Sequence, residues 1–147
     1  MKTRLIILLP ALLLAAACTT LTGNYSYIPV GPQNLSVQVT DYKNIPIYIN
    51  RSDITRPWSG IGLMRVQNLP NNQTVLAGQI ESLKKKGAQK GADALIINQY
   101  FDDDNPGNPY PITLAAYLVK YLDNVSAEDK AKIEAFSKQA AIANARQ

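Results

Sequence analysis

Apolar and polar positions alternate or cluster along this chain in a way that predicts five strands and two helices. Residues 35–40 alternate apolar and polar, which is the period of a strand buried on one face. Residues 94–98 are apolar almost throughout, as in a strand inside a sheet. Residues 112–122 are apolar on both faces and could form a strand or a short helix, but their β-branched and aromatic content favours the strand. The predicted strands are therefore residues 35–40, 45–49, 61–66, 94–98 and 112–122.

The clearest helix lies between the third and fourth strands. Its apolar stripe consists of Leu76, Ile80 and Leu83, at the i, i+4 and i+7 positions. Asn71 or Asn72 can cap its start, and Gly91 can supply a left-handed stop. Gly87 costs helix propensity, so we expect close backbone packing against the sheet there.

A second helix is predicted over residues 127–143. The Ser126 hydroxyl can cap it, and Asp129 follows three residues later as in a capping box. Its apolar stripe is thin and consists of Ile133, Phe136, Ala140 and Ala143. Such a stripe buries little area, so the helix is either docked weakly or completed by a partner.

These elements predict an α+β fold. We expect a small, mainly antiparallel or mixed sheet of about four to five strands, with one helix packed across it and a C-terminal helix. The predicted divisions are a lipoprotein signal peptide at residues 1–17, a lipidated tether at 18–34, an α/β domain at 35–125 and the C-terminal helix at 126–147.

The leader combines a charged start, a short apolar run at residues 5–14, and small residues before Cys18. This is an export-signal pattern, and its apolar stretch is shorter than the roughly 20 residues that a spanning helix needs. Residues 15–18 resemble the bacterial lipobox, L-[AS]-[GA]-C, with Ala15 where leucine is commonest. The resemblance implies acylation of Cys18, cleavage before it, and attachment to membrane lipid. An ordinary signal peptide or an uncleaved anchor is the alternative. Thr19, in place of an aspartate, implies the periplasmic face of the outer membrane.

Charge and composition narrow the function. The chain has 15 basic and 11 acidic residues, and the leader contains two of the basic ones, so the predicted mature chain is close to neutral. A nucleic-acid partner is therefore not expected. The chain has no histidine, and its single cysteine is the predicted acylation site, so Ser-His and Cys-His nucleophiles are excluded. We expect no enzyme and no cofactor.

An acidic cluster invites a metal hypothesis. Asp102, Asp103 and Asp104 precede Asn105 and Gly107, and clustered carboxylates attract hard cations. The spacing does not match a calcium-binding loop, and no glutamate closes it. We expect a solvated turn, with a weak divalent-cation site as the alternative.

Aromatic residues are the candidates for contact with a partner. Trp58 lies beside Pro57 in a predicted loop, and tryptophan is enriched at interface hot spots. Tyr25 and Tyr27 make the predicted tether more apolar than a free linker requires, so the alternative to an extended tether is that part of it lies on the domain surface or joins a partner's sheet edge. Phe136 lies on the thin helical stripe. Burial in the core is the alternative for Trp58.

One segment carries a family resemblance. Residues 91–97, GADALII, follow the predicted helix, and residues 114–122, LAAYLVKYL, form a later apolar run. Together they resemble the small YbjQ-like domains and the Rcs-system stress-sensor lipoproteins, in which a closing strand occupies the later position. The resemblance implies a fold and no chemistry, and no functional residue is transferred by it.

The sequence therefore predicts a non-enzymatic outer-membrane lipoprotein that contacts another cell-envelope protein, as an accessory in assembly, secretion or stress response. The alternative is a lipoprotein that binds cell-wall glycan or a small molecule in a pocket lined by tyrosines.

Overall fold

The fold is described from a computed structural model over residues 24–33, 35–36 and 41–144. The predictions for the leader, for Cys18 and for residues 37–40 lie outside these ranges. Leu35 and Ser36, the described part of the first predicted strand, belong to no strand.

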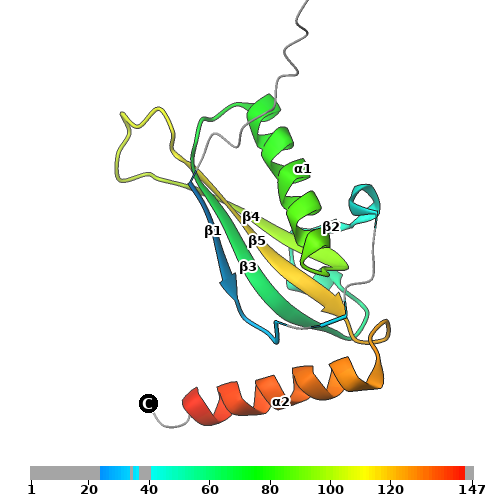
Figure 1. The fold of residues 1–147 in the computed structure, drawn as a ribbon. Helices are drawn as coiled ribbons and strands as arrows, with labels where there is room; N and C mark the ends of the chain where they lie inside the picture. The colour runs from blue at the N-terminus through cyan, green and yellow to red at the C-terminus, as the bar shows by residue number, and fades with distance from the viewer. Residues whose placement is uncertain (1–23, 34, 37–40, 145–147) are drawn as a thin grey trace, which may run out of the picture.

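A single five-stranded sheet organises the molecule (Figure 1). Its spatial order is β1-β3-β5-β4-β2, with β2 parallel to β4 and every other pair antiparallel. The strands are β1 (Asn24–Pro29), β2 (Ile47–Tyr48), β3 (Trp58–Leu69), β4 (Ala94–Phe101) and β5 (Ile112–Tyr121). The predicted α+β fold is confirmed. The short strand β2 lies at an edge, as Pro46 beside it favoured.

The first strand corrects the predicted tether. Residues 24–29 pair with β3, from Asn24 opposite Gln67 to Pro29 opposite Gly62. The tether prediction is wrong for these residues, because β3 needs a partner for its outer backbone groups. Tyr25 and Tyr27, two residues apart, point to the same face and pack against the core of the domain.

Two strands are longer than predicted. Trp58 begins β3 instead of lying in a loop, and Tyr100 and Phe101 continue β4 into the predicted loop. Both extensions pair with β5, in which Tyr121 lies opposite Trp58 and Ile112 lies opposite Phe101. Their backbone groups are satisfied by a neighbouring strand that local composition does not reveal.

Helix α1 (Gln73–Gln89) covers one face of the sheet, and the main core lies between them (Figure 1). Asn72 caps the helix, since its side-chain oxygen accepts a hydrogen bond from the Val75 amide at 3.1 Å. Gly91 has a φ of 82°, as expected for the left-handed stop. A Cβ at Gly87 would lie 2.9 Å from Leu95 Cδ2, so the predicted close packing is confirmed.

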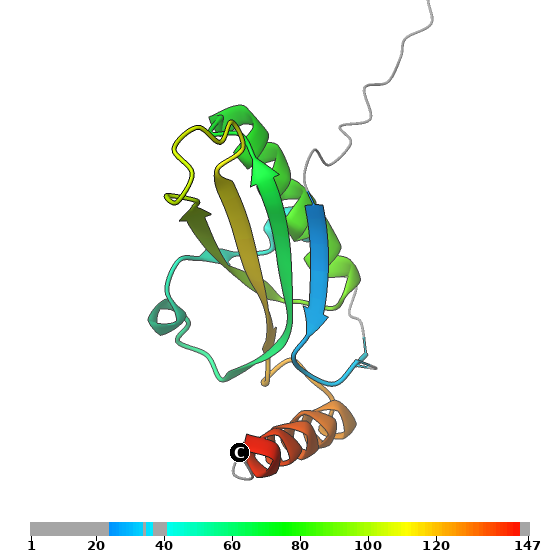
Figure 2. The ribbon, with the colours of Figure 1, turned by 90° about the vertical axis from the view of Figure 1, so that its left-hand side faces the viewer.

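Helix α2 (Ala127–Asn144) lies beyond one end of the sheet and projects toward the side opposite α1 (Figures 1 and 2). Its anchor is near its start, where Asp129 and Ile133 are buried. Phe136, one turn on, is 37% exposed. Neither described helix has the combined length and apolar character that crossing a membrane requires.

Candidate functional site

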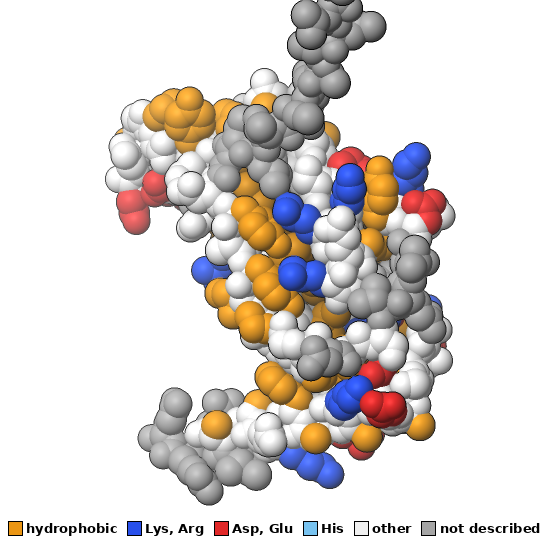
Figure 3. All heavy atoms as spheres, viewed as in Figure 1, with side chains coloured by type: hydrophobic (Ala, Val, Ile, Leu, Met, Phe, Trp, Pro, Cys, Tyr) orange, Lys and Arg blue, Asp and Glu red, His pale blue; other side chains and the backbone are white. Residues whose placement is uncertain are grey.

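Neither described helix covers the sheet face opposite α1 (Figures 1 and 2). In Figure 2 this face is turned toward the viewer, with α1 behind the sheet. The β4–β5 loop projects beyond one end of the sheet and α2 beyond the other (Figures 1 and 2). Between these two projections the molecular outline is hollowed, at the left of Figure 3. We call this surface the open face.

A second, smaller core fills one half of the open face. Ile54, from the segment that joins β2 to β3, packs with the buried residues Ala94, Ile96, Val119 and Tyr121. Trp58 and Tyr117 lie at its rim, with ring centroids 6.3 Å apart in an edge-to-face arrangement. The predicted contact residue Trp58 is therefore half-buried in an intramolecular cluster.

Adjoining this second core, and sharing Ile96 and Tyr117 with it, is a shallow groove that crosses β3, β5 and β4. It comprises two hollows of about 220 and 270 Å3, which share Arg65 and Tyr100. The first is lined by Arg51, Leu63, Arg65, Ile96, Asn98, Tyr100, Ala115 and Tyr117, and the second by Arg65, Gln67, Tyr100 and Thr113. We call this set the open-face groove. Its floor is apolar, and its rim carries cations, amides and phenols.

The groove is positively charged. Its lining includes Arg51 and Arg65 and no acidic residue. The Arg51 guanidinium carbon lies 5.2 Å from the centre of the Tyr117 ring, a cation–π distance. Within the described part of the chain, Arg65 has no ion pair or side-chain hydrogen bond. The groove thus presents two guanidinium groups to solvent above an apolar floor.

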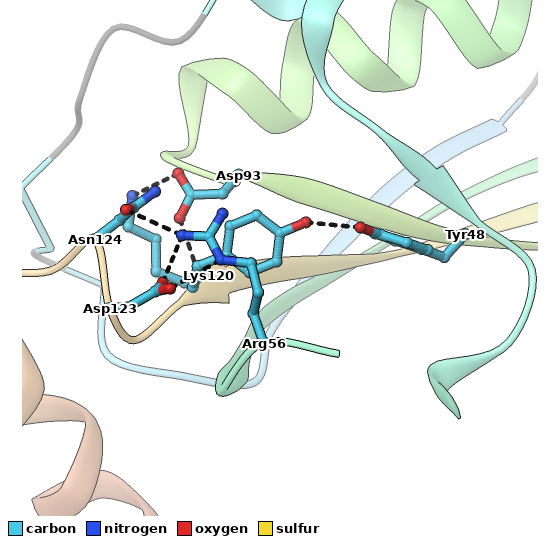
Figure 4. A network of polar contacts seen from close by, with 7 residues as sticks. Tyr48, Arg56, Asp93, Lys120, Asp123 and Asn124 are labelled. Carbon is cyan, nitrogen blue, oxygen red and sulfur yellow. Dashed lines mark hydrogen bonds and ion pairs between the residues drawn. The ribbon is translucent and has the colours of Figure 1, made fainter. Parts of the chain in front are cut away.

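A polar network closes the end of the sheet near α2 (Figure 4). Arg56 donates two hydrogen bonds to the Asp123 carboxylate, at 2.9 and 2.7 Å, and one to Asn124 at 3.1 Å. Its guanidinium also lies 4.1 Å from the centre of the Tyr121 ring. The Tyr121 and Tyr48 hydroxyl oxygens are hydrogen-bonded 3.0 Å apart. Burial, followed by this hydrogen bond, raises the pKa of Tyr121 above its ordinary value.

The same network contains a buried ion pair. Lys120 Nζ lies 3.1 Å from Asp93 Oδ1, and both side chains are almost wholly buried. The other Asp93 oxygen accepts a hydrogen bond from the Tyr121 amide at 2.9 Å. The hydrogen-bonding groups of this pair are satisfied within the protein. We therefore assign the pair a structural role, in which it joins the α1–β4 turn to β5, and no catalytic role.

The two tyrosines of β1 are engaged on the α1 side. Lys86 Nζ lies 4.5 Å from the centre of the Tyr25 ring, and Lys90 Nζ lies 4.0 Å from that of Tyr27. Burial, and then the neighbouring Tyr27, raise the pKa of Tyr25. The structure therefore places both candidates in contacts between β1 and α1.

The acidic cluster lies exposed in the β4–β5 loop. Asp102 accepts a hydrogen bond from the Asn108 side chain at 3.2 Å, which braces the loop. Over residues 24–33, 35–36 and 41–144, no group of three or more acidic, cysteine or histidine side chains is arranged to hold a metal ion. Asp102, Asp103 and Asp104 therefore do not form a converging ligand set.

Sequence analysis did not single out Arg51, Arg65 or Asn98. A signal for Arg65 was present, because Leu63 and Arg65 alternate with Met64 and Val66 along a predicted strand and must share the face opposite the core. Arg51 carried no such signal, since only the path of the β2–β3 segment brings it over Tyr117.

Comparisons with known proteins yield one weak structural match. No family model matches the sequence, and no curated protein gives a significant match. The crystal structure of a Francisella virulence factor, FvfA, aligns with a TM-score of 0.48 and 18% sequence identity. The alignment covers 65% of this chain and 95% of that one.

Proposed function

We propose that this protein is a non-enzymatic lipoprotein, anchored through Cys18 on the periplasmic face of the outer membrane, whose open face contacts another cell-envelope protein. The observation that supports the contact is the hollowed open face itself. It lies between two projecting segments and carries exposed aromatic and cationic side chains over an apolar floor. Interfaces are enriched in tyrosine, other aromatic residues and arginine.

The open form of the groove favours a protein partner over a small molecule. Small-molecule sites are usually clefts of about 300–1,000 Å3 that enclose most of the ligand. The two hollows here, of about 220 and 270 Å3, are shallow and open along the sheet, so they would enclose little of such a ligand. An open surface of this kind suits side chains presented by a partner's surface. The alternative is a glycan or small-molecule ligand, and it is favoured by Tyr100 and Tyr117 in the lining of the hollows.

The contact can be tested by site-specific photo-crosslinking in intact envelopes. A photoreactive phenylalanine analogue would replace Tyr100, which is 56% exposed at the groove. The matched control carries it at Glu81, an exposed position of α1 on the other side of the sheet. We expect one reproducible protein adduct from position 100 and none from position 81. No adduct from position 100, or the same adduct from both, contradicts the proposal.

A further inference from the structure

We infer that the open-face groove binds an acidic peptide segment of its protein partner. In this arrangement an apolar side chain of the segment lies over Leu63, Ile96 and Ala115, while neighbouring carboxylates pair with Arg51 and Arg65. The inference rests on the proposed function, which supplies a protein partner. It goes further by naming the chemistry that the partner presents.

Charge complementarity is the first argument. Arg56, which also lies on this side of the molecule, is neutralised by Asp123 at 2.7 Å and held by Asn124. Arg51 and Arg65 line the same hollow of about 220 Å3, and no carboxylate lines it with them. The planar fork of a guanidinium fits a carboxylate with two parallel hydrogen bonds. Two such groups beside one hollow favour a ligand with more than one carboxylate.

The floor of the groove is the second argument. Ile96 and Ala115 are buried in it, and Leu63 is half-buried. The neutral polar groups of this hollow are the Asn98 amide and the hydroxyl groups of Tyr100 and Tyr117. A neutral sugar ring has no carboxylate to pair with the two arginines, so it would use the charged rim less fully than an acidic ligand. A leucine, phenylalanine or tyrosine side chain flanked by aspartate or glutamate meets both the floor and the rim.

The layout of the groove is the third argument. Arg51 lies over Tyr117 from the β2–β3 segment, Arg65 lies on β3, and Tyr100 lies near the end of β4. Arg65 and Tyr100 line both hollows, so the two form one continuous surface. A groove that crosses three strands suits an extended segment with several contacts, and its exposed cations make the association dependent on salt.

Binding can be measured with the full-length chain in detergent and a fluorescent nine-residue peptide that has a central phenylalanine among aspartates and glutamates. A second peptide replaces every carboxylate with the matching amide. We expect saturable binding of the acidic peptide, at least tenfold weaker binding of the amide peptide, and weakening as salt is raised. Equal binding of the two peptides, or no binding of the acidic one, overturns the inference.

The variant R51Q/R65Q locates the binding. Both arginines are exposed, and the variant loses the Arg51–Tyr117 cation–π contact, so we expect a folded protein with a slightly lower melting temperature. Binding of the acidic peptide should be at least tenfold weaker. The matched control K85Q/K130Q removes two exposed positive charges from the helices and should change binding by less than twofold. Equal loss in both double variants would show a general charge effect and overturn the inference.

Competition and crosslinking separate the remaining outcomes. The competitors are polygalacturonate and vesicles containing phosphatidylglycerol, each added at the same charge concentration as the peptide. Displacement of the peptide by either one would show that the groove recognises anionic polymers or lipid surfaces in general. That result would overturn the peptide assignment. If the crosslink from position 100 persists in R51Q/R65Q while the peptide fails to bind wild type, the proposed function stands and this inference fails. If position 100 gives no adduct but the peptide binds through the two arginines, the proposed partner contact at that position fails.

Discussion

At the scale of single residues, the buried pair of Lys120 and Asp93 is the most consequential contact. Lys120 is 1% exposed, so its ammonium has lost nearly all of its water. One Asp93 oxygen accepts a hydrogen bond from the Lys120 ammonium, which compensates for the lost water, and the other accepts a hydrogen bond from the Tyr121 amide. An ion pair of this kind contributes little net stability when intact, but removing one member leaves a charge without compensation.

The variant D93N should therefore be strongly destabilised. We expect a loss of about 3–5 kcal/mol in the free energy of unfolding, measured by urea denaturation. D123N is the matched control, because it removes the carboxylate of an exposed pair with Arg56 and should cost less than about 1 kcal/mol. Similar losses in the two variants would contradict burial as the cause.

Glycine at position 87 is required by packing and not by turn geometry. It lies in α1 where a Cβ would meet Leu95, a fully buried residue of β4. Gly78 lies in the same helix, and a Cβ there would have no atom within 4 Å, so the two sites differ only in their surroundings.

The paired variants G87V and G78V exploit this difference. G87V should lower the free energy of unfolding by about 1–3 kcal/mol through overpacking. G78V should be neutral or raise it by a few tenths of a kcal/mol, because valine has a higher helix propensity than glycine. Thermal denaturation would measure both, and a G87V protein as stable as G78V would show that α1 can move away from the sheet.

At the scale of elements, α2 is tied down at one end. Its first turn is fixed by Asp129, which accepts a hydrogen bond from the Ser36 amide at 3.0 Å, and by Ser126, which accepts one from the Asp129 amide at 3.1 Å. Lys132 forms ion pairs with Glu128 and Asp129 in the same turns. The hydrogen bonds from Ser36 come first among the effects that lower the pKa of Asp129.

The docking of α2 should weaken at acidic pH. Because the folded-state pKa of Asp129 is lowered, its stabilisation is fully present above the ordinary aspartate pKa of about 3.9, and is lost as pH falls through the folded-state value. We expect D129N to melt below wild type at pH 7 and the difference to disappear as pH is lowered past that value. E128Q, which alters an exposed carboxylate of the same turn, should show a much smaller difference at pH 7. A D129N deficit that persists at the lowest pH would contradict the charge argument.

The ends of the helices and strands show which features local sequence patterns can predict. The start of α1 at the Asn72 cap and its end before Gly91 follow from nearest neighbours in the chain, and both were predicted. The ends of β3 and β4 depend on β5, which is remote from β3 in sequence, and both were predicted too short. Strand β1 was missed for the same reason, since its pairing with β3 is nonlocal.

At the scale of the whole molecule, the sheet divides the chain into a packed side and an open side. Helix α1 covers one face, with the main core beneath it (Figure 2). The open-face groove occupies part of the other face. The proposed lipid anchor at Cys18 would hold the whole domain near the membrane, within reach of the proposed envelope partner. Acyl chains stabilise attachment by about 0.8 kcal/mol per buried methylene, so more than one chain is needed for stable anchoring.

The anchor gives a direct prediction for the variant C18S. We expect wild type in the outer-membrane fraction with an acyl mass on residue 18, because the Cys18 thiol is the proposed acylation site. C18S should lose that mass and leave the outer-membrane fraction. The measurements are envelope fractionation and intact-protein mass spectrometry. A wild-type protein with a free thiol, or with the leader still attached, would contradict the lipoprotein proposal.

The sequence alone was enough to predict the α+β class, both helices with their caps, and the positions of most strands. These features are predictable because hydrophobic period and capping depend on residues close together in the chain. The tertiary structure decided which strands are neighbours and that β1 belongs to the sheet. It placed Tyr25 against Lys86 of α1, and Tyr27 against Lys90 just after that helix. It also brought Arg51 and Arg65 to one hollow, although they belong to different elements of the chain. The two arginines come together because of strand pairing and the path of the β2–β3 segment. The residues next to each arginine in the sequence do not reveal these two features.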